Sequence, residues 1–197
     1  MTDQRSVEWF AERLGHVTAS RMSDVQASEG TAARRNYQTQ LIAERLTGRQ
    51  QESFTNHFMQ WGTDTEPLAR AAYQAKHELV DEVGFVKHPL ILWFGASPDG
   101  LVGKHGLVEI KCPATSTHLD WMLEGKVPTK HKPQMLAQLA CTGRAYVDFV
   151  SFDPRLPEDL QLFVVRYEPN ETLIKETEDK VKKFLAEVEK SINLLRG

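Results

Sequence analysis

The stretch "GASPDGLVGKHGLVEIKCP", residues 95–113, decides how the chain is expected to fold, because it reads as a β-hairpin that carries charged side chains. Its apolar residues and glycines predict two strands joined by a turn at "GKHG". On the second strand, Glu109 and Lys111 are two positions apart, so their side chains share one face while Ile110 points to the other. Asp99, on the first strand, falls opposite Glu109 if the loop holds an odd number of residues, such as three.

This register would place the Asp99 and Glu109 side chains roughly 5 Å apart at Cβ. Two carboxylates at that separation repel each other unless a cation or a proton lies between them. Mg²⁺ or Mn²⁺, which prefer oxygen ligands, would resolve the repulsion, and the Ile110 carbonyl could add a backbone ligand. Lys111 could orient a water, assist its deprotonation or neutralise charge on a phosphate. The layout suits phosphodiester hydrolysis. The bare pattern is equally open to a surface hairpin with a Glu–Lys pair.

Composition places the chain among soluble globular proteins. The 197 residues are 41% hydrophobic and 26% charged, which suits a single domain over residues 1–197. The chain contains no run of 18 apolar residues, so we expect no membrane span. The net charge of −3 is not typical of a uniformly basic nucleic-acid binder, so a polyanion would have to meet local basic patches. Cys112 and Cys141 are too few for a disulfide framework or a metal cluster and are predicted to be reduced thiols in a cytoplasmic protein.

Hydrophobic periodicity and capping residues predict a mixed α/β order. We expect helices at 6–15, 20–28, 33–48, 64–78, 116–126 and 132–143, with Pro67 in the first turn of its helix. Strands are expected at 80–88, 90–102, 105–112, 145–153 and 160–168. A last helix begins after Asn170, its predicted cap, with an apolar stripe that we interpret as core packing: Leu173, Ile174, Val181, Phe184, Leu185, Val188, Ile192 and Leu195. The predicted fold class is α/β, with a central mixed sheet flanked by helices.

The hairpin resembles the signature of the PD-(D/E)XK nucleases, specifically the lambda-exonuclease or YqaJ-like viral recombinase family. The likeness extends over nearly the whole chain, because further family-like segments follow in order: "WFAERLGHVTAS" (9–20), "YQTQLIAERLTG" (37–48), "MQWGTDTEPLAR" (59–70), "PQMLAQLACTG" (133–143) and "FDPR" (152–155). One departure is a glutamine pair. The family usually shows Q-x-Q, whereas here Gln134 matches the first position, Leu136 occupies the second, and Gln138 lies one turn further on. Gln134 and Gln138 can still share a helix face.

The resemblance implies a PD-(D/E)XK core with a metal site. Asp99, Glu109 and the Ile110 carbonyl would bind the metal, with Lys111 as the catalytic lysine. Glu66 would be an additional acidic ligand near the metal, although an acid in the first turn of a helix is also favoured by the helix dipole. Of the two glutamines, we assign Gln134 to the catalytic group and Gln138 to DNA binding.

The resemblance also implies a pocket for the 5′-phosphate of a DNA end, formed by Arg13 and Ser20, with Ser97 as a further candidate. A guanidinium and a hydroxyl at a helix N-terminus make an anion site in physical terms. The same residues could equally be a solvated arginine and a simple N-cap serine.

As a whole, the family implies a 5′→3′ exonuclease that acts on double-stranded DNA ends with Mg²⁺, for which Mn²⁺ would substitute. It would leave 3′ single-stranded tails for an annealing protein in phage-type recombination, and it would assemble as a homotrimer. The alternatives are a site-specific or repair endonuclease of the same superfamily, and a DNA-end-binding module that has lost catalysis.

Overall fold

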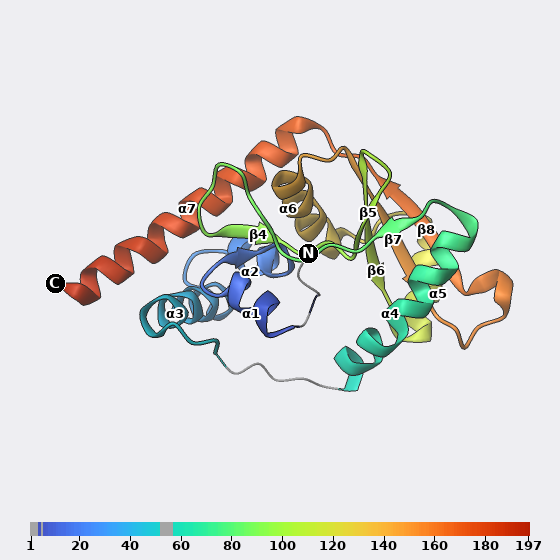
Figure 1. Cartoon of the computed structure of the whole chain (residues 1–197), viewed down its shortest axis with the longest axis horizontal. Coiled ribbons are helices and arrows are strands. Elements are labelled where there is room, and N and C mark those ends of the chain that lie inside the picture. Colours follow the sequence, from blue (N-terminus) through green and yellow to red (C-terminus); the bar gives the residue numbers. More distant parts are fainter. Residues whose placement is uncertain (1–3, 5, 52–56) are drawn as a thin grey trace.

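The structure is a computed structural model that describes residues 4, 6–51 and 57–197. The chain contains both helices and strands, in agreement with the predicted α/β class (Figure 1). In order, the elements are α1 (Val7–Arg13), β1 (Val17–Thr18), η1 (Ala19–Arg21), α2 (Met22–Gln26), α3 (Ala32–Thr47), α4 (His57–Lys76), β2 (Val80–Asp81), β3 (Val86–Lys87), β4 (Phe94–Ala96), β5 (Gly100–Val102), β6 (Gly106–Lys111), α5 (Thr115–Glu124), η2 (Thr129–His131), α6 (Lys132–Thr142), β7 (Tyr146–Phe152), η3 (Glu158–Leu160), β8 (Leu162–Tyr167) and α7 (Glu171–Arg196).

Two sheets organise these elements. The larger has the strand order β2-β5-β6-β7-β8, and the smaller has the order β1-β4-β3. In the larger sheet, β6 and β7 are parallel and every other neighbouring pair is antiparallel. The parallel pair needs a long crossover, which α5 and α6 provide. The predicted mixed sheet is therefore confirmed.

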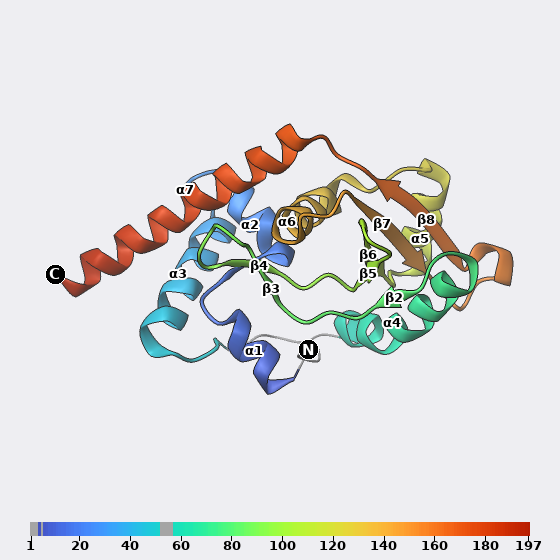
Figure 2. The same cartoon turned by 45° about the horizontal axis from the view of Figure 1, so that its top comes forward.

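Helices cover both faces of the larger sheet (Figure 2). Successive side chains of β6 alternate between these faces, as a strand requires. On the face covered by α4, one apolar cluster includes Ala69, Tyr73, Val108, Ile110 and Val150. On the face covered by α5 and α6, another includes Leu107, Trp121, Met135, Leu139 and Phe149. The side chains of Glu109 and Lys111 lie on the second face, where α6 packs against the sheet.

The last helix confirms its predicted cap and most of its apolar stripe. Asn170 Oδ1 accepts a hydrogen bond from the Leu173 N–H at 3.0 Å. Val181, Phe184 and Val188 are fully buried in the core cluster that α7 shares with α3 and α6. The prediction was wrong for Leu173, which is 39% exposed, and for Leu195, which is 69% exposed. Leu195 lies at the end of α7, which extends beyond the rest of the molecule (Figure 1).

Three predicted boundaries were wrong. The expected strand 80–88 is divided into β2 and β3, which lie in different sheets. The expected strand 90–102 is divided into β4 and β5, which lie in different sheets. Pro98 lies between them and has no N–H to donate to a ladder, so the pairing stops there. The helix α4 begins at His57 instead of residue 64, which places Pro67 inside the helix. Proline removes only one intrahelical hydrogen bond, and the buried residues on either side of it, Thr65 and Ala69, keep the helix packed.

None of the helices in the described part of the chain is both long enough and apolar enough to cross a membrane.

Candidate active site

The hairpin of β5 and β6 has the register that the sequence predicted. Gly100 pairs with Val108 and Val102 with Gly106, which leaves a three-residue loop at 103–105. One step beyond the Gly100–Val108 pair, Asp99 lies opposite Glu109. The Ile110 N–H donates to Asp99 Oδ2 at 2.6 Å, which fixes the Asp99 carboxylate beside the second strand. The two carboxylates therefore share one face of the hairpin.

Gly100 allows β5 to pack closely against β2. A Cβ atom at this position would lie only 2.0 Å from Val80 Cγ1 on β2, the strand on the other side of β5. Any residue with a side chain would therefore push β5 away from β2 immediately after Asp99. The Pro-Asp-Gly sequence thus combines a strand break, a carboxylate and a close backbone contact in three consecutive residues.

The charges of the hairpin act strongly on one another. Burial raises the pKa of Asp99 well above its usual range, and the nearby carboxylates of Glu109 and Glu66 raise it further, against a smaller lowering by Lys111. Glu109 is fully buried, and its Oε1 lies 2.5 Å from Lys111 Nζ. Burial alone would lower the pKa of Lys111, but the carboxylates of Glu109 and Asp99 outweigh it and raise that pKa, so Lys111 is an ammonium ion.

The helix α6 supports Glu109 from the same face of the sheet. The Gln138 side chain is fully buried, and its Nε2 donates to Glu109 Oε2 at 2.5 Å. Gln138 therefore points at the carboxylate and away from the surface, which is not the placement expected of a DNA contact. Gln134 lies one turn earlier, is half-buried and makes no hydrogen bond to the described residues.

Glu66 approaches the site from the opposite side of the sheet, on α4. Its Oε1 accepts a hydrogen bond from Arg70 Nη2 at 2.8 Å. The same nitrogen lies 3.3 Å from the Asp99 carbonyl oxygen, and Arg70 Nη1 lies 2.8 Å from Glu82. Arg70 thus connects Glu66 to the Asp99 backbone. Sequence reasoning did not single out Arg70, although its spacing of four residues from Glu66 on a helix is the signal that could have found it.

A divalent cation fits the donors at the hairpin. Within residues 4, 6–51 and 57–197, no three His, Cys, Asp or Glu side chains are gathered as a complete metal-binding group. The two carboxylates and the Ile110 carbonyl form an all-oxygen donor set, which is the kind that Mg²⁺ prefers. The pKa of Asp99 is raised first by burial and then by repulsion from Glu109, and a bound cation would relieve that repulsion.

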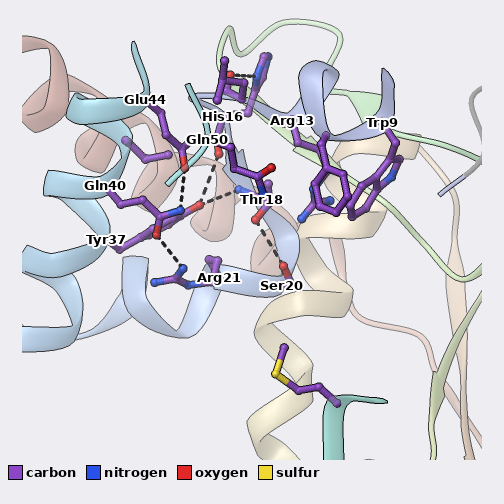
Figure 3. Close-up of a pocket in the computed structure, with 14 residues that line it drawn as sticks. Trp9, Arg13, His16, Thr18, Ser20, Arg21, Tyr37, Gln40, Glu44 and Gln50 are labelled. Carbon is purple, nitrogen blue, oxygen red and sulfur yellow. Dashed lines mark hydrogen bonds between the residues drawn. The ribbon is translucent and has the colours of Figure 1, made fainter. Parts of the chain in front are cut away.

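A pocket of about 290 Å³ is lined by two of the three predicted phosphate-binding residues (Figure 3). Arg13 and Ser20 both line it. Arg13 Nη1 and Trp9 Nε1 donate to Ser97 Oγ at 2.9 and 3.0 Å, and the guanidinium carbon lies 4.0 Å from the centre of the Trp9 ring. Trp9 and Arg13 line the pocket and both bind Ser97, which is not itself part of the lining. Ser20 lies 3.4 Å from Thr18 at their hydroxyl oxygens.

Arg13 is a half-buried cation that has no ion-pair partner among the described carboxylates. Burial lowers its pKa to about 10, and the more distant Glu44 partly opposes this effect. The guanidinium is therefore still charged at neutral pH. A charged group in a desolvated pocket without a counter-ion is suited to bind an anion.

The pocket and the hairpin are joined through the chain itself. Ser97 accepts the Arg13 hydrogen bond at the end of β4, and Asp99 follows two residues later. An anion held by Arg13 would thus lie close to the paired carboxylates.

Comparisons with known proteins are consistent with this geometry. Residues 8–145 match the family model of the YqaJ-like viral recombinase domain. A search among curated proteins finds no significant match. The chain is 52% identical to the alkaline exonuclease LHK-Exo from Laribacter hongkongensis, with a TM-score of 0.90 over 97% of this chain and 96% of that one, and LHK-Exo has also been solved in complex with dAMP. A phage-related exonuclease from Haemophilus somnus shares the fold, with a TM-score of 0.71 at 14% identity over 91% of this chain and 96% of that one.

Proposed function

The chain belongs to the YqaJ-like viral recombinase family, and we propose that it is a Mg²⁺-dependent exodeoxyribonuclease that digests double-stranded DNA in the 5′→3′ direction. Nuclease activity follows from the family and from the similarity to an alkaline exonuclease over nearly the whole chain. The observation that supports the rest is the Arg13–Ser97 hydrogen bond, which connects the anion pocket to a serine two residues before Asp99 of the carboxylate pair. The DNA end and the phosphodiester bond to be cut would therefore lie side by side.

The chain's own residues suit phosphodiester hydrolysis. Asp99, Glu109 and the Ile110 carbonyl would hold Mg²⁺, which when bound supplies an activated water and a Lewis acid. Lys111 is held as an ammonium ion by the surrounding carboxylates, which suits stabilisation of the negative charge that develops on the phosphate. Gln138 holds the Glu109 carboxylate in place from α6.

The pocket supports the proposed polarity. A terminal 5′-phosphate bound by Arg13 and Ser20 would place the first phosphodiester bond at the hairpin, so digestion would begin at 5′ ends. Removal of one strand from a duplex leaves a 3′ single-stranded tail, which is the substrate of an annealing protein. We therefore propose an annealing partner of the phage-recombination type.

The test of exonuclease activity compares linear and closed-circular duplexes of one sequence, incubated with Mg²⁺ and with the metal chelated. We expect digestion of the linear form alone, and only with Mg²⁺, with Mn²⁺ as a working substitute. Cutting of the circle would indicate an endonuclease of the same superfamily. Binding to linear ends without digestion, under every metal condition, would indicate an end-binding module.

The pocket is tested by the initial rates on 5′-phosphorylated and 5′-hydroxyl duplexes. Loss of a charge-assisted hydrogen bond costs roughly 1.5–3 kcal/mol, so the phosphorylated end should be digested on the order of ten- to a hundred-fold faster. Arg13→Ala should remove most of this preference by slowing only the phosphorylated substrate. Arg35→Ala, which alters an exposed arginine of α3, serves as the control and should leave the preference intact. Equal rates on both ends with the unmodified protein would contradict the pocket.

We further propose that the protein works as a homotrimer. Exposed leucines support an additional interface: Leu194 and Leu195 at the end of α7 are 74% and 69% exposed. Light scattering on the purified protein gives the oligomeric mass directly, and a monomer at micromolar concentration would contradict this proposal.

A further inference from the structure

His131 contributes an unpaired polar atom to the interior beside the hairpin. Its Nε2 is buried and has no hydrogen-bond partner among the residues that the structure describes. The ring stacks on Phe149 with centroids 5.4 Å apart and meets the edge of Trp121 at the same distance. Packing thus fixes the ring, while the nitrogen is left unsatisfied. A buried polar atom in that state costs free energy unless a partner reaches it during function.

The location of His131 points to the hairpin as the source of that partner. Phe149, on which the ring stacks, is the direct neighbour of Glu109 across β6 and β7. His131 immediately precedes α6, and its spacing of seven residues from Gln138 places both on the helix face that meets Glu109. Burial, and after it the Lys111 charge, lower the pKa of His131 to about 3. His131 is therefore neutral at physiological pH, and Nε2 is an acceptor when the proton is on Nδ1.

Lys111 is the group that would need such an acceptor. Its ammonium lies 2.5 Å from Glu109 Oε1, and Gln138 binds the other oxygen, Oε2. A divalent cation on Glu109 would compete with the ammonium for Oε1. Lys111 has a flexible stem and can move, and a half-buried ammonium that leaves its carboxylate is stabilised by a nearby acceptor.

We propose that His131 is a positioning residue that accepts the Lys111 ammonium at Nε2 when Glu109 takes up the cation. This inference rests on the proposed metal-dependent function and assigns a role to a residue outside the family-like motif. His131 would hold Lys111 beside the cation, so that the ammonium faces the phosphate instead of blocking a ligand oxygen. Loss of Nε2 would leave Lys111 to compete with the metal for Glu109.

The test measures Mg²⁺ affinity of the full-length protein by calorimetry, without DNA. His131→Phe keeps the ring on Phe149 and Trp121 but removes the acceptor, and His131→Gln restores an amide oxygen at a similar reach. A hydrogen bond to a charged group is worth enough that His131→Phe should weaken Mg²⁺ binding roughly tenfold or more, with substantial recovery in His131→Gln. If His131→Phe fails to fold, His131→Leu serves in its place.

The same pair of measurements in a Lys111→Met background separates this role from a structural one. Without the ammonium there is nothing for Nε2 to accept, so His131→Phe should then leave Mg²⁺ affinity unchanged. An equal loss in both backgrounds, or no loss in either, would overturn the inference. Activity distinguishes the two proposals: an inactive wild-type protein that still shows the His131 effect contradicts only the nuclease, and an active one without the effect contradicts only the role of His131.

Discussion

Asp99→Asn should stabilise the metal-free protein while it abolishes nuclease activity. Asn keeps the oxygen that accepts the Ile110 N–H but removes the charge. In the folded protein that charge is opposed by burial, by Glu109 and by Glu66, and only Lys111 and the Ile110 N–H favour it. Removal of the charge therefore lowers the free energy of the folded protein overall, because the unfavourable interactions that it removes outweigh the favourable ones.

The size of the effect can be estimated from the hairpin geometry. Directly opposed residues lie about 5 Å apart, and at an effective dielectric constant of about 20 two like charges at that distance repel by about 3 kcal/mol. The attraction to Lys111 offsets part of this. We expect a net gain of about 1–3 kcal/mol in the free energy of unfolding, which corresponds to roughly 3–10 °C in melting temperature for a chain of this size.

The sign of the pH dependence follows from the raised pKa. A carboxyl group with a folded pKa above its unfolded value costs stability once the pH exceeds the unfolded value, and the cost grows until the folded pKa is passed. The gap between Asp99→Asn and the unmodified protein should therefore close as the pH is lowered towards 3.8, the ordinary value for Asp. The gap should reach its full size only above the raised folded pKa of Asp99.

The assay is urea unfolding followed by tryptophan fluorescence, first with a chelator and then with Mg²⁺. Mg²⁺ should stabilise the unmodified protein and have little effect on the variant. Asp148→Asn is the matched control, because Asp148 is a buried carboxylate paired with Arg166 at 2.8 Å and should lose about 2–3 kcal/mol on neutralisation. If Asp99→Asn also loses stability in the chelator, Asp99 belongs to a structural ion pair and the reasoning fails.

Two further predictions concern the charged groups around the hairpin. Lys111→Met should retain DNA binding and lower kcat by about 10²–10³-fold, as measured in single-turnover digestion, and a near-normal rate would exclude it from the chemistry. Burial alone would raise the pKa of Asp153, but hydrogen bonds from Arg155 and Thr115 lower it to about 2. Its charge therefore contributes stability that is present above pH 3.8 and lost as the pH falls towards 2. Asp153→Asn should lose about 2 kcal/mol at pH 7, with the deficit shrinking in acid unfolding experiments below pH 4, and a constant deficit would contradict the assignment.

The hairpin could be predicted because its geometry is local. Strand alternation fixes the shared face of Glu109 and Lys111, and the three-residue loop fixes Asp99 opposite Glu109. The division of the preceding strand at Pro98 was missed, although a proline in a strand is a known sign of an edge or a break. The prediction of a single strand over 90–102 relied on its apolar residues and took no account of Pro98.

Residues that reach the site through tertiary packing could not be predicted in this way. Gln138 was expected at the DNA but is buried behind Glu109, because the packing of α6 on the sheet, and not the sequence spacing, sets the depth of each glutamine. Arg70 and His131 come from elements on opposite faces of the sheet. The local sequence around these two residues does not indicate which strand each of them will contact.

The two-residue interval between Ser97 and Asp99 would set the length of the product that is released. Two residues span at most about 7 Å even when fully extended, and the intervening Pro98 restricts their flexibility further. If the terminal phosphate binds at Arg13 and the metal at Asp99, the distance from the DNA end to the cut is built into covalent geometry and does not vary with sequence or with domain motion. A distance this short accommodates a single nucleotide. Each turnover would therefore release a mononucleotide and present the next phosphate to the same pocket.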